Sequence, residues 1–453
     1  MENIVEGVVE GVLKGNEDAF FATPASAPRR VGSVEATGGR EDSVESGGGS
    51  DIGNVGSSGE ERMGMGLGGG VDLEEAEAAL VVDWGDARVF ESSSEGEEEG
   101  GEGVKAYAGV QAGGDVDESH PVVRAYVAAC REARVTPVAR VLLEPDVEVL
   151  DLEHFGLGPR GMVALAAGLE KGSKTRALVL GDNWVGEEGA AALGRLFSAA
   201  GHISSARLDG NAIGRGAIPL FAELDNNQTL TELDMSGNGL GDDEALALAD
   251  LLDDNHTLVR VNVSRNEIGS QGAYALGMAL ENNSMIESFD LAWNSIRLGG
   301  AKMFARALAQ HPSLASLNLA WNGLDDAPTA LLGKALRTAF SLTYLNLASN
   351  RFGPRGAKAL FDGVKVGTLE TLILDGNALS DQKLSSERAL LAALEENQSL
   401  STLSIKGILI ADDVRDSLAQ IVHDKADRLG KVLTIIPLHS GGSVGDGDGD
   451  GEG

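Results

Sequence analysis

The chain has 453 residues, of which 62 are glycine and only 4% are aromatic, so we expect a core built from Leu, Ala, Val and Ile. The formal net charge of -34 opposes phosphate backbones and anionic lipid headgroups, which disfavours nucleic acid and membrane as partners. Cys130 is the single cysteine, which excludes an intrachain disulfide and a cysteine metal cluster and indicates a reducing compartment. Because the sequence shows neither a signal peptide nor an apolar run of membrane-spanning length, we expect a cytoplasmic protein.

Residues 1–118 differ in composition from the rest of the chain. They contain 27 acidic and seven basic residues, a net charge of -20, in a background of Gly, Ser and Glu. Such a segment has too few apolar side chains to form a core, so it is predicted to be a disordered acidic arm. Two stretches within it, residues 4–13 and 76–90, contain enough Val, Leu, Trp and Phe to act as transient helices or docking motifs.

Residues 119–146 are predicted to form an N-terminal helical cap. Apolar residues recur at helical spacing from Val122 to Val141, and Pro137 interrupts the pattern because proline lacks an N–H donor. The cap precedes a repeat array, where the first apolar face needs a cover.

An asparagine recurs along the chain at intervals of 27 or 28 residues. Each lies in an L-x-x-L-x-L-x-x-N-x-[L/I] segment, the signature of a leucine-rich repeat. The eight are Asn183, Asn211, Asn238, Asn266, Asn294, Asn322, Asn350 and Asn377. We expect them to be structural, because a side-chain amide can pair the backbone groups left buried where the chain leaves the strand.

Each repeat combines a strand pattern with a helix pattern. Apolar and polar residues alternate in its first half, while stretches such as 272–283 have helical periodicity. Gly-Ala pairs open several helices where the backbone passes close to its neighbour, whereas Glu244 and Pro328 depart from this pattern. The predicted fold is an α/β right-handed solenoid or horseshoe, with a parallel sheet on the concave face and helices on the convex face.

About ten repeats span residues 147–410, and those at the ends are atypical. Phe155 and Ile408 occupy the asparagine position in the first and last repeats, as expected for capping repeats. Residues 411–439 are predicted to form a C-terminal cap of a helix and a strand. Residues 440–453 are predicted to be a disordered Gly/Asp tail.

The repeats resemble those of the ribonuclease-inhibitor-like family of leucine-rich repeats. A closer resemblance is to the family named leucine-rich repeat-containing protein 74, carried by Tyr126, Cys130, Val135 and Pro137 and by GLGPRG at 156–161. It is also carried by LAWNSI at 291–296 and LAWNGL at 319–324, and it covers about residues 122–438. The resemblance implies the fold but no biochemical activity.

Several sequence motifs match chemistry that their context excludes. Gly64, Gly66 and Gly69 fit a dinucleotide loop, and residues 441–445 fit a nucleophile elbow, but neither has the strand and helix it needs. Asp446, Asp448 and Asp450 begin an EF-hand pattern that lacks the required glutamate. We therefore expect no enzyme activity, no metal site and no cofactor. Four Asn-x-Ser/Thr sequences, at Asn227, Asn255, Asn282 and Asn397, are attributed to the repeat rather than to glycosylation.

The outward-facing strand positions form the candidate binding surface. They present a polar series that includes Asp234, Asn262, Asp290, Asn318 and Asn346. Trp293 and Trp321 occupy one repeat position in adjacent repeats, so they are predicted to be in contact, near Arg265. They are either a binding hot spot, since Trp and Arg are enriched there, or rim packing.

The predicted function is an intracellular scaffold or adaptor that binds a protein partner and is itself a monomer. The alternative is a regulator of a small GTPase, because Ran GTPase-activating proteins have a similar repeat and an acidic segment. In this chain the acidic segment lies mainly before the repeats rather than after them.

Overall fold

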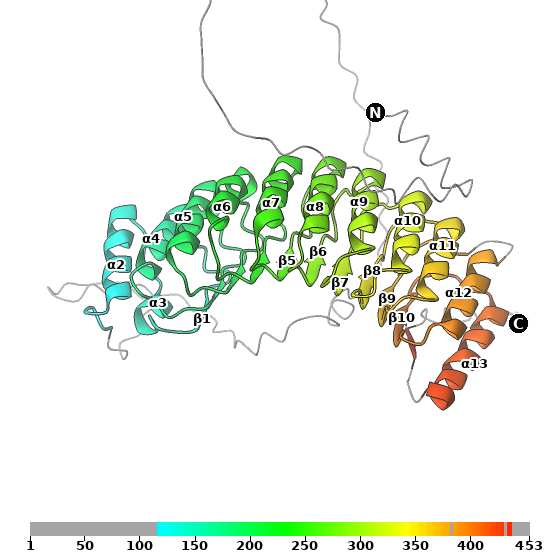
Figure 1. Ribbon diagram of the computed structural model, residues 1–453. Coiled ribbons are helices and arrows are strands. Elements are labelled where there is room, and N and C mark those ends of the chain that lie inside the picture. Colours follow the sequence, from blue (N-terminus) through cyan, green and yellow to red (C-terminus); the bar gives the residue numbers. More distant parts are fainter. Residues whose placement is uncertain (1–115, 381–383, 430–432, 437–453) are drawn as a thin grey trace, which may run out of the picture. The chain divides into compact units, whose positions relative to one another are not determined.

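The computed structural model describes residues 116–380, 384–429 and 433–436 (Figure 1). The predicted acidic arm up to residue 115, the tail from residue 440, and the motifs at Gly64–Gly69 and 441–450 lie outside the described residues.

Eleven short strands form one sheet in chain order among the described residues, and every neighbouring pair is parallel. They are β1 Val149–Asp151, β2 Ala177–Val179, β3 Ser205–Arg207, β4 Glu232–Asp234, β5 Arg260–Asn262, β6 Ser288–Asp290, β7 Ser316–Asn318, β8 Tyr344–Asn346, β9 Thr371–Ile373, β10 Thr402–Ser404 and β11 Thr434–Ile436. A helix follows each of the first ten strands, so each repeat contributes one strand and one helix.

The helices stack beside one another on one side of the sheet (Figure 1). They are α2 Pro121–Ala133, α3 Ala139–Leu143, α4 Gly158–Leu169, α5 Gly186–Ala199, the 3-10 turn η3 Gly214–Gly216, α6 Ala217–Leu224, α7 Asp242–Asp254, α8 Ser270–Asn282, α9 Leu298–Leu308, α10 Asp326–Leu336, α11 Pro354–Val364, α12 Ser385–Glu396 and α13 Asp412–Leu429. We call the outer side of the helices the helix face and the outer side of the strands the sheet face.

The core lies between the sheet and the helices. The central residue of each strand from β1 to β10 is buried, as Leu317 is in β7. In the same repeat Leu319, Leu324, Leu332 and Leu336 are at most 1% exposed. Each buried leucine contributes about 1.5–3 kcal/mol relative to an exposed one. The predicted α/β repeat solenoid is therefore confirmed.

The eight repeated asparagines form a hydrogen-bonded column inside the solenoid, which we call the asparagine ladder. All eight are buried. The amide of Asn322 donates to the carbonyls of Leu291 at 2.9 Å and Ala320 at 3.1 Å, and its Oδ1 accepts the N–H of Ile296 at 3.1 Å. Each asparagine thus bonds both its own turn and the preceding repeat.

Glycines near the start of the helices allow neighbouring repeats to approach closely. A β-carbon on Gly272 would lie 2.6 Å from that of Ala245 in α7, closer than two such atoms can approach. In α7 the corresponding residue is Glu244, whose carboxylate accepts the N–H of Gly241 at 2.8 Å and closes the start of the helix. Pro328 lies in the first turn of α10, where its missing N–H breaks no helical hydrogen bond.

A second set of buried side chains closes the loops that follow the helices. Asn227, Asn255, Asn283 and Asn397 each accept two backbone N–H groups from the following residues through Oδ1. Three of the four Asn-x-Ser/Thr sequences are thereby explained by burial. In the fourth, the structural role predicted for Asn282 was wrong. Asn282 is exposed, and its neighbour Asn283 occupies the buried position.

The two ends of the array are covered by helices. Pro137 lies between α2 and α3, and the Tyr126 hydroxyl accepts the N–H of Val138 at 3.0 Å. Helix α2 packs on α4, where a β-carbon on Gly168 would lie 2.8 Å from that of Tyr126. Burial raises the pKa of the Cys130 thiol to about 11, so it is protonated at neutral pH. Helix α13 and strand β11 follow the last repeat.

Candidate functional site

The first and third residues of strands β3 to β9 face outward and form two rows across the sheet face. The parallel register aligns them, so that Asp234, Asn262, Asp290, Asn318 and Asn346 follow one another across β4 to β8. The predicted polar series is therefore a continuous row of half-buried side chains.

The sheet face over β1 to β5 is charged and internally paired. The Arg207 guanidinium lies 2.9 Å from Asp209 and 3.5 Å from Glu153, and these carboxylates raise its pKa despite its partial burial. Arg260 pairs with Glu232 across β4 and β5. Burial raises the pKa of Asp234, whose carboxylate accepts hydrogen bonds from Ser236 and Asn262. These charges largely satisfy one another.

The sheet face over β6 to β9 has a different composition, and we call it the neutral sheet surface. Its outward residues are Ser288, Ser316, Tyr344 and Thr371 in one row and Asp290, Asn318, Asn346 and Ile373 in the other. Asp290 is the single charged residue in these two rows. Trp293 lies three residues beyond the end of β6, directly after Ala292, and Trp321 lies three residues beyond the end of β7, directly after Ala320. The surface is thus rich in Ser, Asn, Tyr and Trp, which supply adaptable hydrogen bonds and rigid contact area in protein-binding sites.

Asn318 and its neighbours in the row also shape the turns that follow the strands. Asn318 accepts the N–H of Ala320 at 3.1 Å and donates to Asp290 at 2.9 Å, while Asp290 and Asn346 each close the same two-residue turn. These side chains therefore have a structural role besides any contact with a partner, because each accepts a backbone N–H near the strand end.

Trp293 and Trp321 stack on each other at the edge of the neutral sheet surface. Their ring centroids are 4.0 Å apart with planes 11° from parallel, and they are 43% and 44% exposed. The main chain continues the parallel pairing here, since the N–H of Trp293 donates to the carbonyl of Ala320 at 2.9 Å. The pair therefore presents a rigid aromatic surface to solvent.

Both tryptophans adopt a backbone conformation that disfavours them. The residue before each ladder asparagine has a φ between 51° and 67°, the left-handed region, and three of the eight are glycine. Trp293 has φ 55° and Trp321 has φ 57°. A residue with a β-carbon costs about 1–2 kcal/mol there relative to the right-handed region. Glycine, which occupies this position at Gly210 and Gly376, would adopt the same backbone conformation without that cost.

The other predicted site residues lie around this pair. Arg265 is exposed and lies one repeat before Trp293, at the same position within its repeat. Asp290 is the last residue of β6, the strand that precedes Trp293. Arg351 was not singled out from the sequence, but its guanidinium lies beside Gly323, two residues after Trp321. Two arginines thus flank the stacked tryptophans.

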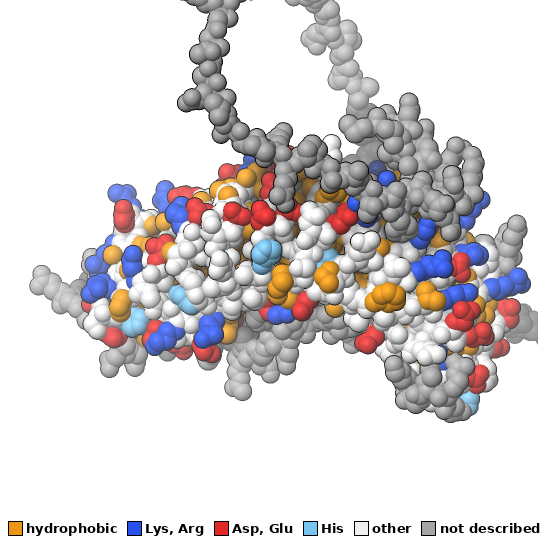
Figure 2. All heavy atoms as spheres, in the orientation of Figure 1, with side chains coloured by type: hydrophobic (Ala, Val, Ile, Leu, Met, Phe, Trp, Pro, Cys, Tyr) orange, Lys and Arg blue, Asp and Glu red, His pale blue; other side chains and the backbone are white. Residues whose placement is uncertain are grey.

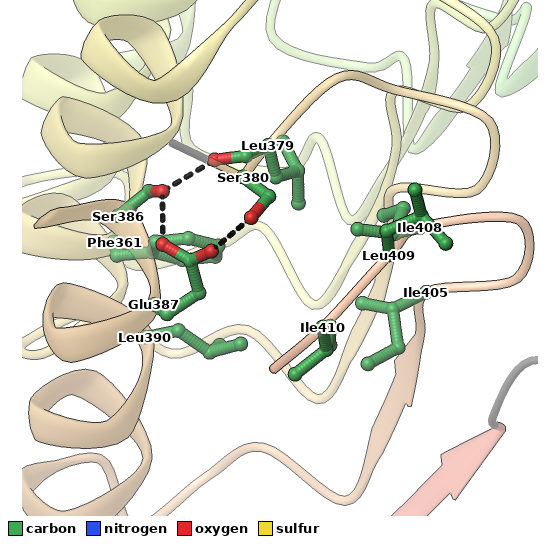
Figure 3. Close-up of a pocket in the computed structure, with 10 residues that line it drawn as sticks. All are labelled: Phe361, Leu379, Ser380, Ser386, Glu387, Leu390, Ile405, Ile408, Leu409 and Ile410. Carbon is green, nitrogen blue, oxygen red and sulfur yellow. Dashed lines mark hydrogen bonds between the residues drawn. The ribbon is translucent and has the colours of Figure 1, made fainter. Parts of the chain in front are cut away.

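A small cavity of about 10 Å³ lies near the C-terminal end of the array, lined by Phe361, Leu379, Leu390, Ile405 and Ile408 (Figure 3). Glu387 also lines it, and its carboxylate points toward Ser380 and Ser386, whose hydroxyls donate to it. This volume admits about one water molecule, so it is not a substrate pocket.

Within residues 116–380, 384–429 and 433–436, no group of three or more His, Cys, Asp or Glu side chains is arranged to hold a metal ion. Nor does any helix of those ranges combine the length and apolar character that crossing a membrane requires.

Comparison with known sequences agrees with the repeat geometry. The family described as Leucine Rich repeat matches residues 226–249, 254–277, 282–305 and 338–361. The chain therefore has the leucine-rich-repeat fold. Each matched segment contains one strand and most of the helix that follows it, namely β4 and α7, β5 and α8, β6 and α9, and β8 and α11.

Three solved structures are similar to the leucine-rich-repeat chain at 15% identity. For actin-binding site 2 of leiomodin-1, the match covers 46% of this chain and 87% of that one, with a TM-score of 0.24. For the Rad7 and Elc1 complex of yeast, the shares are 64% and 75% with a TM-score of 0.36. For an internalin from Listeria monocytogenes, they are 70% and 96% with a TM-score of 0.37. Similarity at this level assigns no function.

Proposed function

We propose that this leucine-rich-repeat protein is a non-enzymatic scaffold or adaptor, and that it binds a protein partner through the neutral sheet surface and the tryptophan stack of Trp293 and Trp321 at its edge. The observation that carries the proposal is the exposed tryptophan stack at two positions where the backbone favours glycine. Strained residues that the fold does not need are typical of functional sites.

The surroundings of the stack also support protein binding. Tryptophan and arginine dominate binding energy at protein interfaces, and Arg265 and Arg351 lie on either side of the pair. The rows over β6 to β9 carry one acid, Asp290, with Asp375 beyond the end of β9, whereas the face over β1 to β5 carries the ion pairs of Arg207 and Arg260, which would have to be desolvated. A neutral polar surface with aromatic anchors loses less solvation free energy when a partner covers it.

The stack could instead serve only to stabilise the edge of the sheet. If the pair served only as rim packing, the stacking of the two rings, which contributes about 0.5–1.5 kcal/mol, would have to offset the free-energy cost of positive φ at both residues. Two strained residues cost more than one stacking contact returns. This comparison favours the binding hypothesis.

The test is affinity capture from the native cell with the full chain and two variants. The double variant Trp293→Gly/Trp321→Gly removes the stack while keeping a residue suited to positive φ. Trp184→Gly is the matched control, because Trp184 is 74% exposed and has φ 57° but lies outside the neutral sheet surface. We expect the control to retain the partners of the unmodified chain and the double variant to lose them. Equal capture by all three proteins would contradict the proposal.

Further assignments belong to the same proposal. The flank at Tyr126 and Cys130 and the two Ala-Trp-Asn repeats support a relationship to leucine-rich repeat-containing protein 74. The proposal includes a cytoplasmic, monomeric protein that binds neither nucleic acid nor membrane. The alternative, a regulator of the Ran GTPase-activating type, predicts that the purified chain accelerates GTP hydrolysis by a small GTPase. A scaffold leaves that rate unchanged.

A further inference from the structure

Helices α6, α7 and α8 expose a row of apolar side chains on the helix face. Ile218, Leu246 and Tyr274 are 38%, 44% and 48% exposed, and each follows directly after the buried alanine near the start of its helix. Ala222 and Met278 lie one turn further along α6 and α8 and are also exposed. We call these five residues the helix-face patch.

Contacts between the helices align the members of the patch. Asn282 of α8 donates to Asp253 of α7 at 2.7 Å, and Arg215, just before α6, lies 3.7 Å from Asp243 of α7. These contacts hold consecutive helices in one register. Ile218, Leu246 and Tyr274 therefore form a continuous row rather than scattered single residues.

Packing of the repeat does not require apolar residues at this position. Lys302, Lys358 and Arg388 occupy it in α9, α11 and α12. The fold therefore accepts long charged side chains there. A contiguous exposed apolar row with a polar border is typical of an interaction surface, whereas single exposed apolar residues are not.

The charge at the middle of the patch is negative, while Arg215 and Lys302 border its two ends. Helix α7 contains six acidic residues and no basic one, and four of these acids, Asp243, Asp250, Asp253 and Asp254, are exposed. Glu223 adds another exposed acid on α6. On the face in view, Asp and Glu side chains follow the upper edge over the middle helices, while Lys and Arg gather toward the two ends (Figure 2).

We propose that the helix-face patch is a second docking site, distinct from the neutral sheet surface, for a basic amphipathic helical segment of a partner protein. The apolar side of such a segment covers Ile218, Leu246, Tyr274 and Met278. Its Lys and Arg side chains lie over Asp250, Asp253 and Asp254, whereas Asp243 already pairs with Arg215. An acidic or purely apolar segment lacks this match, because the acids of α7 would be buried without a counter-charge.

The probe is a fluorescein-labelled helical peptide of leucine and lysine arranged so that one side is apolar and the other basic. Its binding to the full chain is measured by fluorescence anisotropy. A serine and lysine peptide of equal length and charge is the electrostatic control, because the acidic residues 1–118 also attract lysine. The patch variant is Leu246→Ser/Tyr274→Ser. The matched variant is Phe340→Ser/Val366→Ser, which removes two exposed apolar side chains elsewhere.

We expect the patch variant to bind the leucine and lysine peptide roughly tenfold more weakly and the matched variant to bind within about twofold of the unmodified chain. The serine and lysine peptide should bind weakly and equally to all three. Leu246→Lys/Tyr274→Lys provides a second variant, since lysine occupies this position in α9 and α11, and it should lose binding further. Absence of binding by the unmodified chain, equal binding by the patch variant, or equally tight binding of the control peptide would each overturn the proposal.

Discussion

Replacing Asn294 with alanine tests how much the asparagine ladder stabilises the fold, because the change leaves one buried backbone N–H, that of Ile268, without its acceptor. The amide of Asn294 donates to the carbonyls of Val263, Leu291 and Ala292 at 3.0, 3.1 and 3.2 Å. Its Oδ1 accepts the N–H of Ile268 at 3.0 Å. All of these groups are buried within the turn.

Truncation of the side chain leaves three of its four backbone partners with another hydrogen bond and one with none. The Val263 carbonyl keeps a bond from Asn266, the Leu291 carbonyl keeps one from Asn322, and the Ala292 carbonyl keeps one from the Arg265 N–H. The Ile268 N–H loses the acceptor described above. One unpaired buried donor costs about 1–3 kcal/mol, so we expect a loss of about 2 kcal/mol in the free energy of unfolding.

The assay combines thermal unfolding with amide hydrogen exchange. A loss of about 2 kcal/mol lowers Tm by roughly 4–8 °C, and exchange at the Ile268 amide should accelerate more than at neighbouring amides. Asn282→Ala is the control, because Asn282 is exposed and its loss should change stability by less than about 0.5 kcal/mol.

Asn294→Asp separates the two halves of the side chain. The carboxylate keeps the acceptor for Ile268 but faces three carbonyl oxygens, so it should destabilise at least as much at neutral pH. Its deficit should shrink at low pH as the carboxyl protonates. Equal losses for Asn294→Ala and Asn282→Ala, or unchanged exchange at Ile268, would refute the reasoning.

Four further predictions follow from individual contacts. Burial lowers the pKa of His311 to about 4, so between pH 6.5 and 4 the unfolded chain binds a proton at His311 and the folded chain does not. The free energy of unfolding should therefore be unaffected above pH 6.5 and fall by about 2–3 kcal/mol as the pH is lowered to 4. Urea unfolding of His311→Asn should lack that fall. Trp293→Gly/Trp321→Gly should be about 1 kcal/mol per site more stable than the double alanine variant in urea unfolding, because glycine accepts positive φ. Gly333→Ala should lower Tm markedly, because a β-carbon there would lie 2.6 Å from the Leu360 Cα. Removal of residues 1–118 should leave the urea midpoint and the helical circular dichroism unchanged, whereas aggregation or loss of cooperativity would show that the boundary is misplaced.

The repeat was predictable because its restraints recur at a fixed spacing. Asparagine at intervals of 27 or 28 residues, with alternating leucines before it, has one simple physical solution, a stack of strands and helices. The adjacency of Trp293 and Trp321 followed from the same spacing. Neither needed information about side-chain conformation.

The backbone strain of the tryptophans was not predicted, although the sequence contained a signal for it. Gly210, Gly237 and Gly376 occupy the same repeat position, and glycine recurring at one position indicates positive φ. A comparison of that position across repeats would have found the left-handed conformation. It would also have shown that tryptophan there is unfavourable for the fold.

The dual role of Asn318 and the identity of Asn283 were missed for a different reason. Strand alternation predicts which way a side chain points, but not that its oxygen also closes the next turn. Asn and Asp form such turns with the N–H two residues later. The choice between Asn282 and Asn283 depends on where α8 ends, and helix ends are poorly defined by periodicity.

The most direct test of the proposed binding surface is photo-crosslinking in the native cell. A photoreactive amino acid is placed at Ser316, on the neutral sheet surface, or at Ala330, on the outer side of α10. The account predicts a defined crosslinked partner from position 316, its loss when Trp293 and Trp321 are also changed to glycine, and no such product from position 330. A partner crosslinked from position 330 but not from 316, or a product from 316 that persists without the tryptophans, would contradict it.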